Sequence, residues 1–299
     1  MSDEKIYRLI KLFIAVTGRL PESFLNFLSD CLGQIWYLFD KRHRHVVIDN
    51  IQLAYPEKFS SANARRFAKK NFKHISRILI QLIWSYANSP PKIFKRFEIR
   101  GIEHLLQAKK KGRGVLCLLC HMGNFELLSA GFAKVGIDPY VLYRKLDFSP
   151  LERLMLEVRQ RFGATMIPLR KASKKIETIL KGGGVVGTLL DQNVDWYKGV
   201  FVDFFGTPAC TNNGFAKLVL KTKAPVITAF IRMEHNQFVV EFFPEIPLDY
   251  SGDTIRDIEK NTQNYVWAVE AMVRRCPEQY FWVHRRWKTK PYCLLKERD

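Results

Sequence analysis

From residue 97 onward, short runs of strand-type residues alternate with segments of helical periodicity. The strand-type runs are 97–99, 114–120, 140–143, 165–168, 185–190, 226–231 and 238–243. The helical segments are 103–111, 126–135, 150–162, 171–181, 212–223 and 253–273. Because parallel strands need a crossover that a helix usually supplies, this alternation predicts an α/β fold. We expect a mostly parallel central sheet with helices on both faces.

The first 95 residues carry no strand-type run and are predicted to be helical. We divide the chain into residues 1–40, two amphipathic membrane-interacting helices; 41–95, a helical lead-in; and 96–299, the α/β domain. No run in the first segment approaches the roughly twenty apolar residues that a membrane span needs. The helices 6–16 and 24–39 could lie in a bilayer surface, or they could simply pack on the domain.

The charge of the chain is strongly positive. It has 48 Lys and Arg against 29 Asp and Glu, a formal charge of +19. Such an excess indicates an anionic partner, which could be nucleic acid, an acidic protein or anionic lipid. The 22 Phe, 11 Tyr and 6 Trp favour lipid, since aromatic and basic groups together suit a membrane interface. We therefore expect an anionic membrane surface and no nucleic acid.

One strand-type run ends abruptly in His121, and after a Gly-Asn turn Glu126 follows in the first turn of the next helix. Open α/β sheets place their chemistry at such strand ends. A histidine with a carboxylate partner commonly deprotonates a hydroxyl. Seven His and 29 acids in 299 residues would give the spacing about 0.7 times by chance, so the alternative is a surface His beside an ordinary acid. The position at a strand end favours the catalytic interpretation.

Cationic and backbone groups near this pair are candidates for stabilising an oxyanion or binding phosphate. Arg144 closes the strand after the His121 helix, and Arg159 and Arg161 close the helix that follows. A guanidinium can bind phosphate or carboxylate in a bidentate manner, although cations at helix C-termini are favoured in any case. The backbone N–H groups near Gly123 and Asn124 are alternative oxyanion donors.

Two further polar groups follow buried runs. Asp191 and Gln192 end the run 185–190, where Asp191 could bind a sugar hydroxyl, orient an arginine or cap the loop. The C-terminal stretch 277–288 mixes aromatic residues with His284, Arg285 and Arg286. These three are candidates for contact with phosphate or with an acidic carrier, and the alternative is a C-terminal cap packed by its tryptophans.

The sequence contains no recognisable metal or cofactor motif. Cys117 and Cys120 form a C-x-x-C inside a strand-type run, with no second pair to complete a zinc site. Side chains alternate along a strand, so these two point to opposite faces and are predicted to be small buried hydrophobes. We therefore expect neither a metal nor a cofactor.

Several motifs in order resemble those of one family, the lipid A biosynthesis lauroyl and myristoyl acyltransferases. The motifs are His121-x-x-x-x-Glu126, Tyr143-Arg144-x-Leu-Asp147, Asp191-Gln192, Phe204-Phe-Gly206-x-Pro208 and Gln279-Tyr-x-Trp-x-His-Arg-Arg-x-Lys288. The likeness also includes Asn50 and Tyr55-Pro-Glu57, so it spans nearly the whole chain. Each motif is weak alone, and the ordered set is specific to the superfamily rather than to the acceptor.

The resemblance implies a fold like that of the glycerol-phosphate acyltransferases, making 96–299 an acyltransferase domain. It implies an acyl carrier protein thioester as donor, a lipid A precursor or related glycolipid as acceptor, and the His-x4-acid pair as catalyst. His121 would be the general base, with Glu126 hydrogen-bonded to its other ring nitrogen. It also implies the cytoplasmic face of the bacterial inner membrane, with peripheral or N-terminal attachment. Family members commonly begin with a membrane-spanning helix, which Arg19, Glu22 and Asp30 interrupt here.

Two other functions compete with this interpretation. The nearer one is an acyltransferase for a lysophospholipid, aminolipid or mannoside, which differs only in the acceptor pocket. The distant one is a non-enzymatic protein that binds nucleic acid or membranes, suggested by the charge and the Trp/Arg-rich stretch 277–288. Binding alone does not require a His–acid pair at a strand end.

Overall fold

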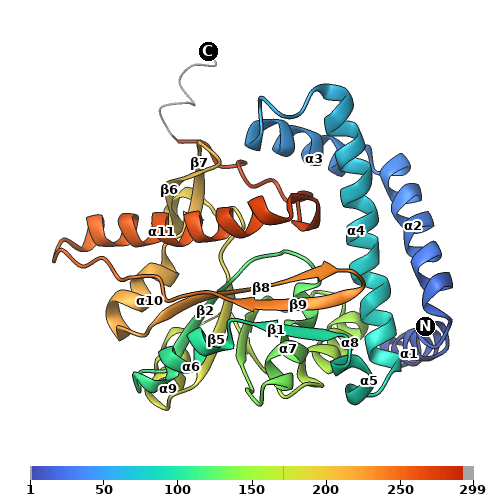
Figure 1. Cartoon of the computed structure of the whole chain (residues 1–299), viewed down its shortest axis with the longest axis horizontal. Helices are drawn as coiled ribbons and strands as arrows, with labels where there is room; N and C mark the ends of the chain where they lie inside the picture. The colour runs from blue at the N-terminus through green and yellow to red at the C-terminus, as the bar shows by residue number, and fades with distance from the viewer. Residues whose placement is uncertain (1, 171, 292–299) are drawn as a thin grey trace.

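A computed structural model describes residues 2–170 and 172–291. Its centre is a seven-stranded sheet with the order β1-β9-β8-β2-β5-β3-β4 (Figure 1). Among the described strands of this sheet, only β8 and β9 pair in antiparallel fashion, so the predicted mostly parallel sheet is confirmed. The strands are β1 (Phe97–Arg100), β2 (Val115–Leu119), β3 (Tyr140–Tyr143), β4 (Thr165–Pro168), β5 (Val185–Leu189), β8 (Val226–Glu234) and β9 (Gln237–Phe242).

Helices cover both faces of this sheet, as expected, and each face has its own apolar core. One face carries α6 (Ile102–Lys110), α7 (Leu128–Lys134) and α8 (Ser149–Gln160). The other carries α9 (Ser173–Lys181), α10 (Gly214–Thr222) and α11 (Thr254–Arg275). Cys117 belongs to the first core and Cys120 to the second, which confirms that they point to opposite faces.

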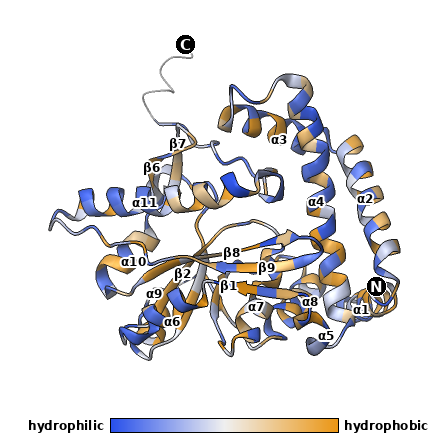
Figure 2. Cartoon of the chain, in the orientation of Figure 1, coloured by the Kyte–Doolittle hydropathy of each residue, from blue (hydrophilic) through white to orange (hydrophobic). Residues whose placement is uncertain are grey.

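Five helices precede the sheet, as the absence of strand-type runs predicted. They are α1 (Asp3–Thr17), α2 (Glu22–Phe39), α3 (Lys41–Ala54), α4 (Ser61–Ala87) and α5 (Pro90–Phe94). Ser60 caps α4 by accepting a hydrogen bond from the N–H of Asn63. The hydropathy of α4 changes from hydrophilic near α3 to hydrophobic near α5 (Figure 2), and its buried residues contribute to both cores. This helix therefore joins the N-terminal segment to the sheet.

One element was not fully predicted. The apolar stretch from Gly199 forms β6 (Gly199–Phe204), and it pairs with β7 (Thr207–Asn212) as a separate two-stranded sheet. No strand was predicted for residues 207–211, and residue 212 was expected to begin the next helix, whereas it ends β7. The hairpin packs against α11 (Figure 1), which supplies the tertiary contacts that the local sequence does not reveal.

Three predictions remain open at this point. The boundaries between the segments 1–40, 41–95 and 96–299 stay predictions. Residue 171, the expected first residue of one helix, and residues 292–299 of the α/β domain lie outside the described residues. Within the described part of the chain, none of the helices combines the length and the apolar character needed to cross a bilayer.

Candidate active site

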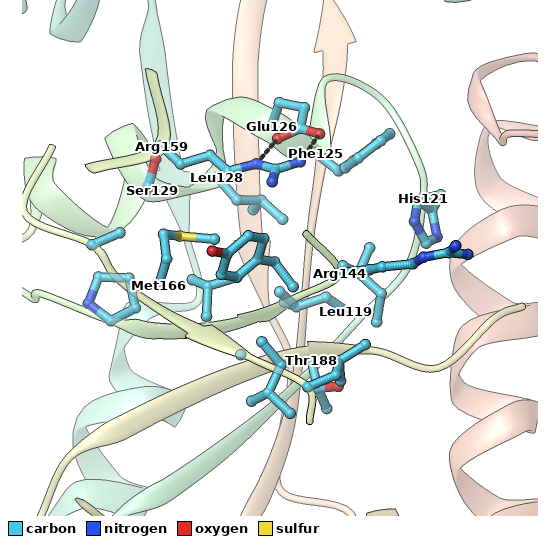
Figure 3. A pocket seen from close by; sticks show the side chains of 18 of the residues that line it. Leu119, His121, Phe125, Glu126, Leu128, Ser129, Arg144, Arg159, Met166 and Thr188 are labelled. Atoms are coloured by element: carbon cyan, nitrogen blue, oxygen red, sulfur yellow. Dashed lines mark hydrogen bonds and ion pairs between the residues drawn. The ribbon is translucent and has the colours of Figure 1, made fainter. Parts of the chain in front are cut away.

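A largely apolar cavity of about 420 Å³ lies between the sheet and the helices α7 and α8. The sheet side is made by β2, β3, β4 and β5, and the opposite side by α7 together with Arg159 of α8. Figure 3 shows His121 and Arg144 at one end of this cavity, and Met166 and Ser129 toward the other. The cavity therefore opens at the carboxyl ends of the strands, where the sequence predicted the chemistry.

His121 is held by a carboxylate, but this carboxylate belongs to Asp191 rather than Glu126. The ring Nδ1 of His121 lies 2.8 Å from Oδ1 of Asp191, and the backbone N–H of His121 donates to Oδ2 at 3.1 Å. The Asp191 side chain is only 2% exposed, against 17% for His121. Because the Nδ1 N–H donates a hydrogen bond to Asp191, Nε2 is the ring nitrogen whose lone pair can accept a proton.

Two opposing effects set the acidity of this pair. Burial lowers the pKa of His121, but the charge and hydrogen bond of Asp191, helped by the charge of Glu126, outweigh burial, so the pKa is raised overall. Burial raises the pKa of Asp191, but His121 and the backbone N–H bonds outweigh it, so this pKa is lowered. Asp191 is therefore an anion beside an imidazole that binds protons more strongly than usual.

The register of the sheet explains why these two residues meet. β2 and β5 are parallel neighbours, and Leu119 is paired with Leu189. His121 and Asp191 each follow that pair by two residues, so they leave the sheet side by side. The expected hydrogen bond between Glu126 and His121 is wrong, because it assumed a partner next in sequence rather than one on the adjacent strand.

Glu126 instead pairs with Arg159. The Nε and Nη2 atoms of Arg159 each donate to Glu126 at 2.7 Å, a bidentate ion pair in which both side chains are largely buried. Figure 3 shows the Glu126 carboxylate directed toward the Arg159 guanidinium. Both residues line the cavity, and their charges neutralise each other at its wall.

The turn after His121 is packed too tightly to offer the expected oxyanion donors at every position. The N–H of Gly123 donates to the carbonyl of Gln279 at 2.9 Å, so it is occupied. Gly123 has a φ of 54°, and a Cβ there would come within 2.0 Å of the Ile231 carbonyl oxygen. Asn124 is fully buried, and its side-chain amide donates to Ile78 and Gln81. Both residues therefore hold the turn in place.

Of the other predicted residues, two lie near His121 and one does not. Arg144 and Gln192 are exposed and line the cavity, with Nε2 of Gln192 at 3.3 Å from Nε2 of His121. Arg161, in contrast, donates to the carbonyls of Ser85, Tyr86 and Asn88 at the end of α4. We expected one of Arg159 and Arg161 to face His121. Arg159 lines the cavity, whereas Arg161 caps α4.

The C-terminal candidates differ among themselves. Arg286 is 2% exposed and donates to the Cys210 carbonyl at 3.0 Å and to the Thr211 hydroxyl, so it is an internal clamp and not a surface contact. His284 is half-buried, and its Nε2 accepts from the N–H of Asn193 at 2.9 Å. Arg285 is exposed. The prediction for Arg286 is wrong because burial cannot be recognised from a local run of cations.

The same C-terminal segment has a structural role that the sequence did not reveal. The N–H of Phe281 donates to the His121 carbonyl at 2.9 Å, and Tyr280 forms a β-bridge with Met122. Asn71 of α4 donates to the carbonyls of Glu278 and Tyr280, and these two hydrogen bonds attach the segment to α4. The segment thus holds the turn that carries His121.

The arrangement can perform general-base catalysis beside an apolar cavity. An imidazole with Nδ1 fixed by a carboxylate can accept a proton from a hydroxyl at its other nitrogen, where the exposed Gln192 amide lies at 3.3 Å. The described residues contain no cluster of three or more His, Cys, Asp or Glu side chains suited to a metal ion. The sequence carried one signal for Asp191 as the partner of His121. Both residues lie two positions beyond the end of a strand.

The chain is similar to members of one known family over nearly its whole length. The profile of the family described as bacterial lipid A biosynthesis acyltransferase matches residues 4–289 of the chain. A lipid A biosynthesis lauroyltransferase of Escherichia coli (strain K12) is 28% identical over 281 residues, which cover 91% of this chain and 88% of the relative.

Two other relatives align over a similar extent. The lipid A biosynthesis palmitoleoyltransferase of the same organism is 26% identical over 281 residues, with 91% of this chain and 88% of the relative covered. A lipid A biosynthesis acyltransferase of Haemophilus influenzae is 25% identical over 281 residues, with 93% and 86% covered. The family profile, which matches residues 4–289, therefore covers both the N-terminal helices and the sheet.

Proposed function

Because the chain belongs to the bacterial lipid A biosynthesis acyltransferase family and is therefore an acyltransferase, we propose that it acylates a glycolipid hydroxyl. The donor is an acyl carrier protein thioester, and the acceptor is a lipid A precursor or a related glycolipid. The names of the relatives support the acceptor class, and the basic surface of the chain suits an acidic carrier protein.

His121 acts as the general base in this proposal. Its Nε2 takes the proton of the acceptor hydroxyl as the oxygen attacks the thioester carbonyl carbon. The tetrahedral intermediate then collapses, the carbon–sulfur bond breaks, and the imidazolium returns the proton to the leaving thiolate. Asp191 holds the Nδ1 proton and stabilises the imidazolium, which is the role first expected of Glu126. No covalent acyl-enzyme is required.

The oxyanion needs a donor near His121. Arg144 is exposed and lines the His121 end of the cavity, so its guanidinium is our candidate for this role. Arg159 has two of its nitrogens committed to Glu126, so it is less suited to meet a developing charge. In our proposal the Glu126–Arg159 pair forms a neutral wall beside the acyl chain.

An exposed apolar surface on the first two helices and the turn between them supports work at a membrane. We call it the outer face, and it consists of Leu9, Leu12, Phe13, Val16, Leu20, Phe24, Phe27, Leu32, Ile35, Leu38 and Phe39. These positions recur at helical spacing, while Tyr7, Ile14 and Leu25 face inward. We propose that the outer face lies in the cytoplasmic leaflet of the inner membrane, with basic side chains such as Lys5 and Arg8 at the lipid phosphates.

The observation that carries this proposal is the His121–Asp191 pair at the mouth of an apolar cavity. His121→Ala should reduce acyl transfer by about 10²-fold or more, because it removes the general base. The measurement is transfer from purified acyl carrier protein thioesters to lipid, followed by mass spectrometry, with an unchanged melting temperature as the folding control.

The same mass spectrometry identifies the acceptor. Total lipids are compared from cells with the wild-type protein and with His121→Ala, and the fragment that gains the acyl mass names the acceptor class. Transfer at the wild-type rate by folded His121→Ala would remove His121 from the mechanism. Acyl gain on a lysophospholipid, aminolipid or mannoside would replace the proposed acceptor.

A further inference from the structure

The apolar cavity is layered along the strands that line it. The first level, two residues inward from His121, is the paired Leu119 and Leu189. Two residues further inward, Val141 pairs with both Gly187 and Met166. The third level consists of Pro139 and Ala164, which precede Val141 and Met166 by two residues. All three levels line one continuous cavity.

The inner end of this cavity is closed by buried side chains. Ala164 is buried beside Pro139, whose carbonyl accepts from the N–H of Thr165 at 2.9 Å. Phe132 of α7 is buried on the helix side of the cavity. Its ring packs edge-to-face on that of Phe242, with the two ring centroids 5.3 Å apart. A chain that enters at His121 therefore meets the buried side chains of Pro139, Ala164 and Phe132 at the third level.

Gly187 makes the middle level wide enough for a ligand. A glycine inside a strand weakens the strand, and it often marks a place where another group approaches closely. A Cβ at Gly187 would lie 3.0 Å from Cδ1 of Leu119, in the space above the sheet that the cavity occupies. The missing side chain thus widens the cavity between its mouth and its inner end.

We propose that this cavity limits the length of the acyl chain, with Pro139 and Ala164 setting the greatest length that the enzyme transfers. The inference rests on the proposed function and adds the specificity of its donor. The level of His121 and the third level are six residue positions apart along the strand direction, which is about 20 Å at roughly 3.3 Å per residue. An extended chain advances about 1.2 Å per bond, so the cavity accepts roughly fourteen to sixteen carbons.

The experiment uses the purified full chain and an equimolar mixture of saturated acyl carrier protein thioesters of graded length. Products are resolved by mass spectrometry. Ala164→Leu places a larger side chain at the closed end, and should shorten the preferred chain by about two carbons, because two added bonds reach about 2.5 Å. Turnover of the shorter chains should stay within about twofold of the wild type. Ala133→Leu, on the same α7 as Phe132 but not lining the cavity, is the matched control and should leave the profile unchanged.

A second variant keeps the test valid if Ala164→Leu does not fold. Gly187→Ala requires only a small shift of the Leu119 side chain, and it narrows the second level. Gly187→Ala should slow the transfer of chains long enough to pass that level. It should leave the rate of transfer of shorter chains unchanged. A length profile unchanged in both folded variants, or slowed equally at all lengths, would overturn the length limit while leaving the function intact. Failure of the wild type to transfer any chain would instead reject the proposed function.

Discussion

At the scale of single residues, the partner of His121 decides how the site works. Asp191 is almost fully buried and receives two hydrogen bonds from His121, one from the ring and one from the backbone. Such a carboxylate fixes both the tautomer and the orientation of the imidazole. Glu126, five residues from His121 in sequence, is committed to Arg159. The catalytic assignment of Glu126 stays a prediction that activity must test.

The raised pKa of His121 predicts the pH dependence of the reaction. A general base must be unprotonated, so kcat/KM falls as the pH drops through this pKa, and the acid limb of the wild type should lie above 6.5. Asp191→Asn removes the negative charge, which should move the limb to lower pH and reduce the plateau rate by about 10²–10⁴-fold. The measurement is kcat/KM against pH for both proteins.

Glu126→Gln is the comparison for this pH profile. The charge of Glu126 also raises the pKa of His121, but less than that of Asp191, so the acid limb should move by a smaller amount. If Glu126→Gln moves the limb as far as Asp191→Asn, then Glu126 is the functional partner of His121. An acid limb that stays in place in Asp191→Asn would count against the role of Asp191.

At the scale of elements, α1 and α2 each have one packed side and one exposed apolar side. The packed side of α1 is fastened to α8 by polar groups, since Glu157 accepts from Lys11 at 3.1 Å and from Tyr7. Asp30 of α2 is paired with Lys73 and Arg77 of α4. The apolar residues of the outer face are therefore not needed to attach these helices, which leaves them available to lipid.

Substitutions on the outer face should weaken membrane binding without unfolding the protein. Phe13 and Phe27 are 62% and 65% exposed, so a Phe13→Ser, Phe27→Ser double variant removes little packing. Burying each ring in lipid contributes about 1.5–3 kcal/mol, so binding should weaken by about tenfold or more. The measurement is flotation with anionic vesicles. Tyr250→Ser, an equally exposed aromatic outside the face, is the control, and equal binding by all three proteins would reject the outer face as the lipid contact.

At the scale of the whole molecule, the excess of 19 positive charges acts over the entire surface. Part of this charge is used internally, as the buried Arg286 and the α4-capping Arg161 demonstrate. The exposed remainder produces a positive field that attracts acidic partners and anionic lipid alike. Long-range attraction of this kind is sensitive to ionic strength, because salt shortens the screening distance from about 10 Å at 0.1 M to about 3 Å at 1 M.

Salt should therefore weaken recognition of an acyl carrier protein donor. We expect the KM for the carrier substrate to rise with ionic strength while kcat stays nearly constant, because the buried His121–Asp191 pair is shielded from salt. Steady-state kinetics over a sodium chloride series measures this, with a short acyl thioester that lacks the carrier as the control substrate. A flat KM for the carrier substrate would mean that charge does not recruit it.

The sequence by itself determined the helices, the main strands and the position of His121 at a strand end. These features follow from the spacing of apolar residues, which acts within a few turns or strand positions. Only the tertiary structure decided that β5 lies between β2 and β3, although the chain reaches β3 first. That order brings Asp191, seventy residues away, to His121, and leaves Glu126 to Arg159. Strand order depends on how the whole sheet packs, which no local pattern records.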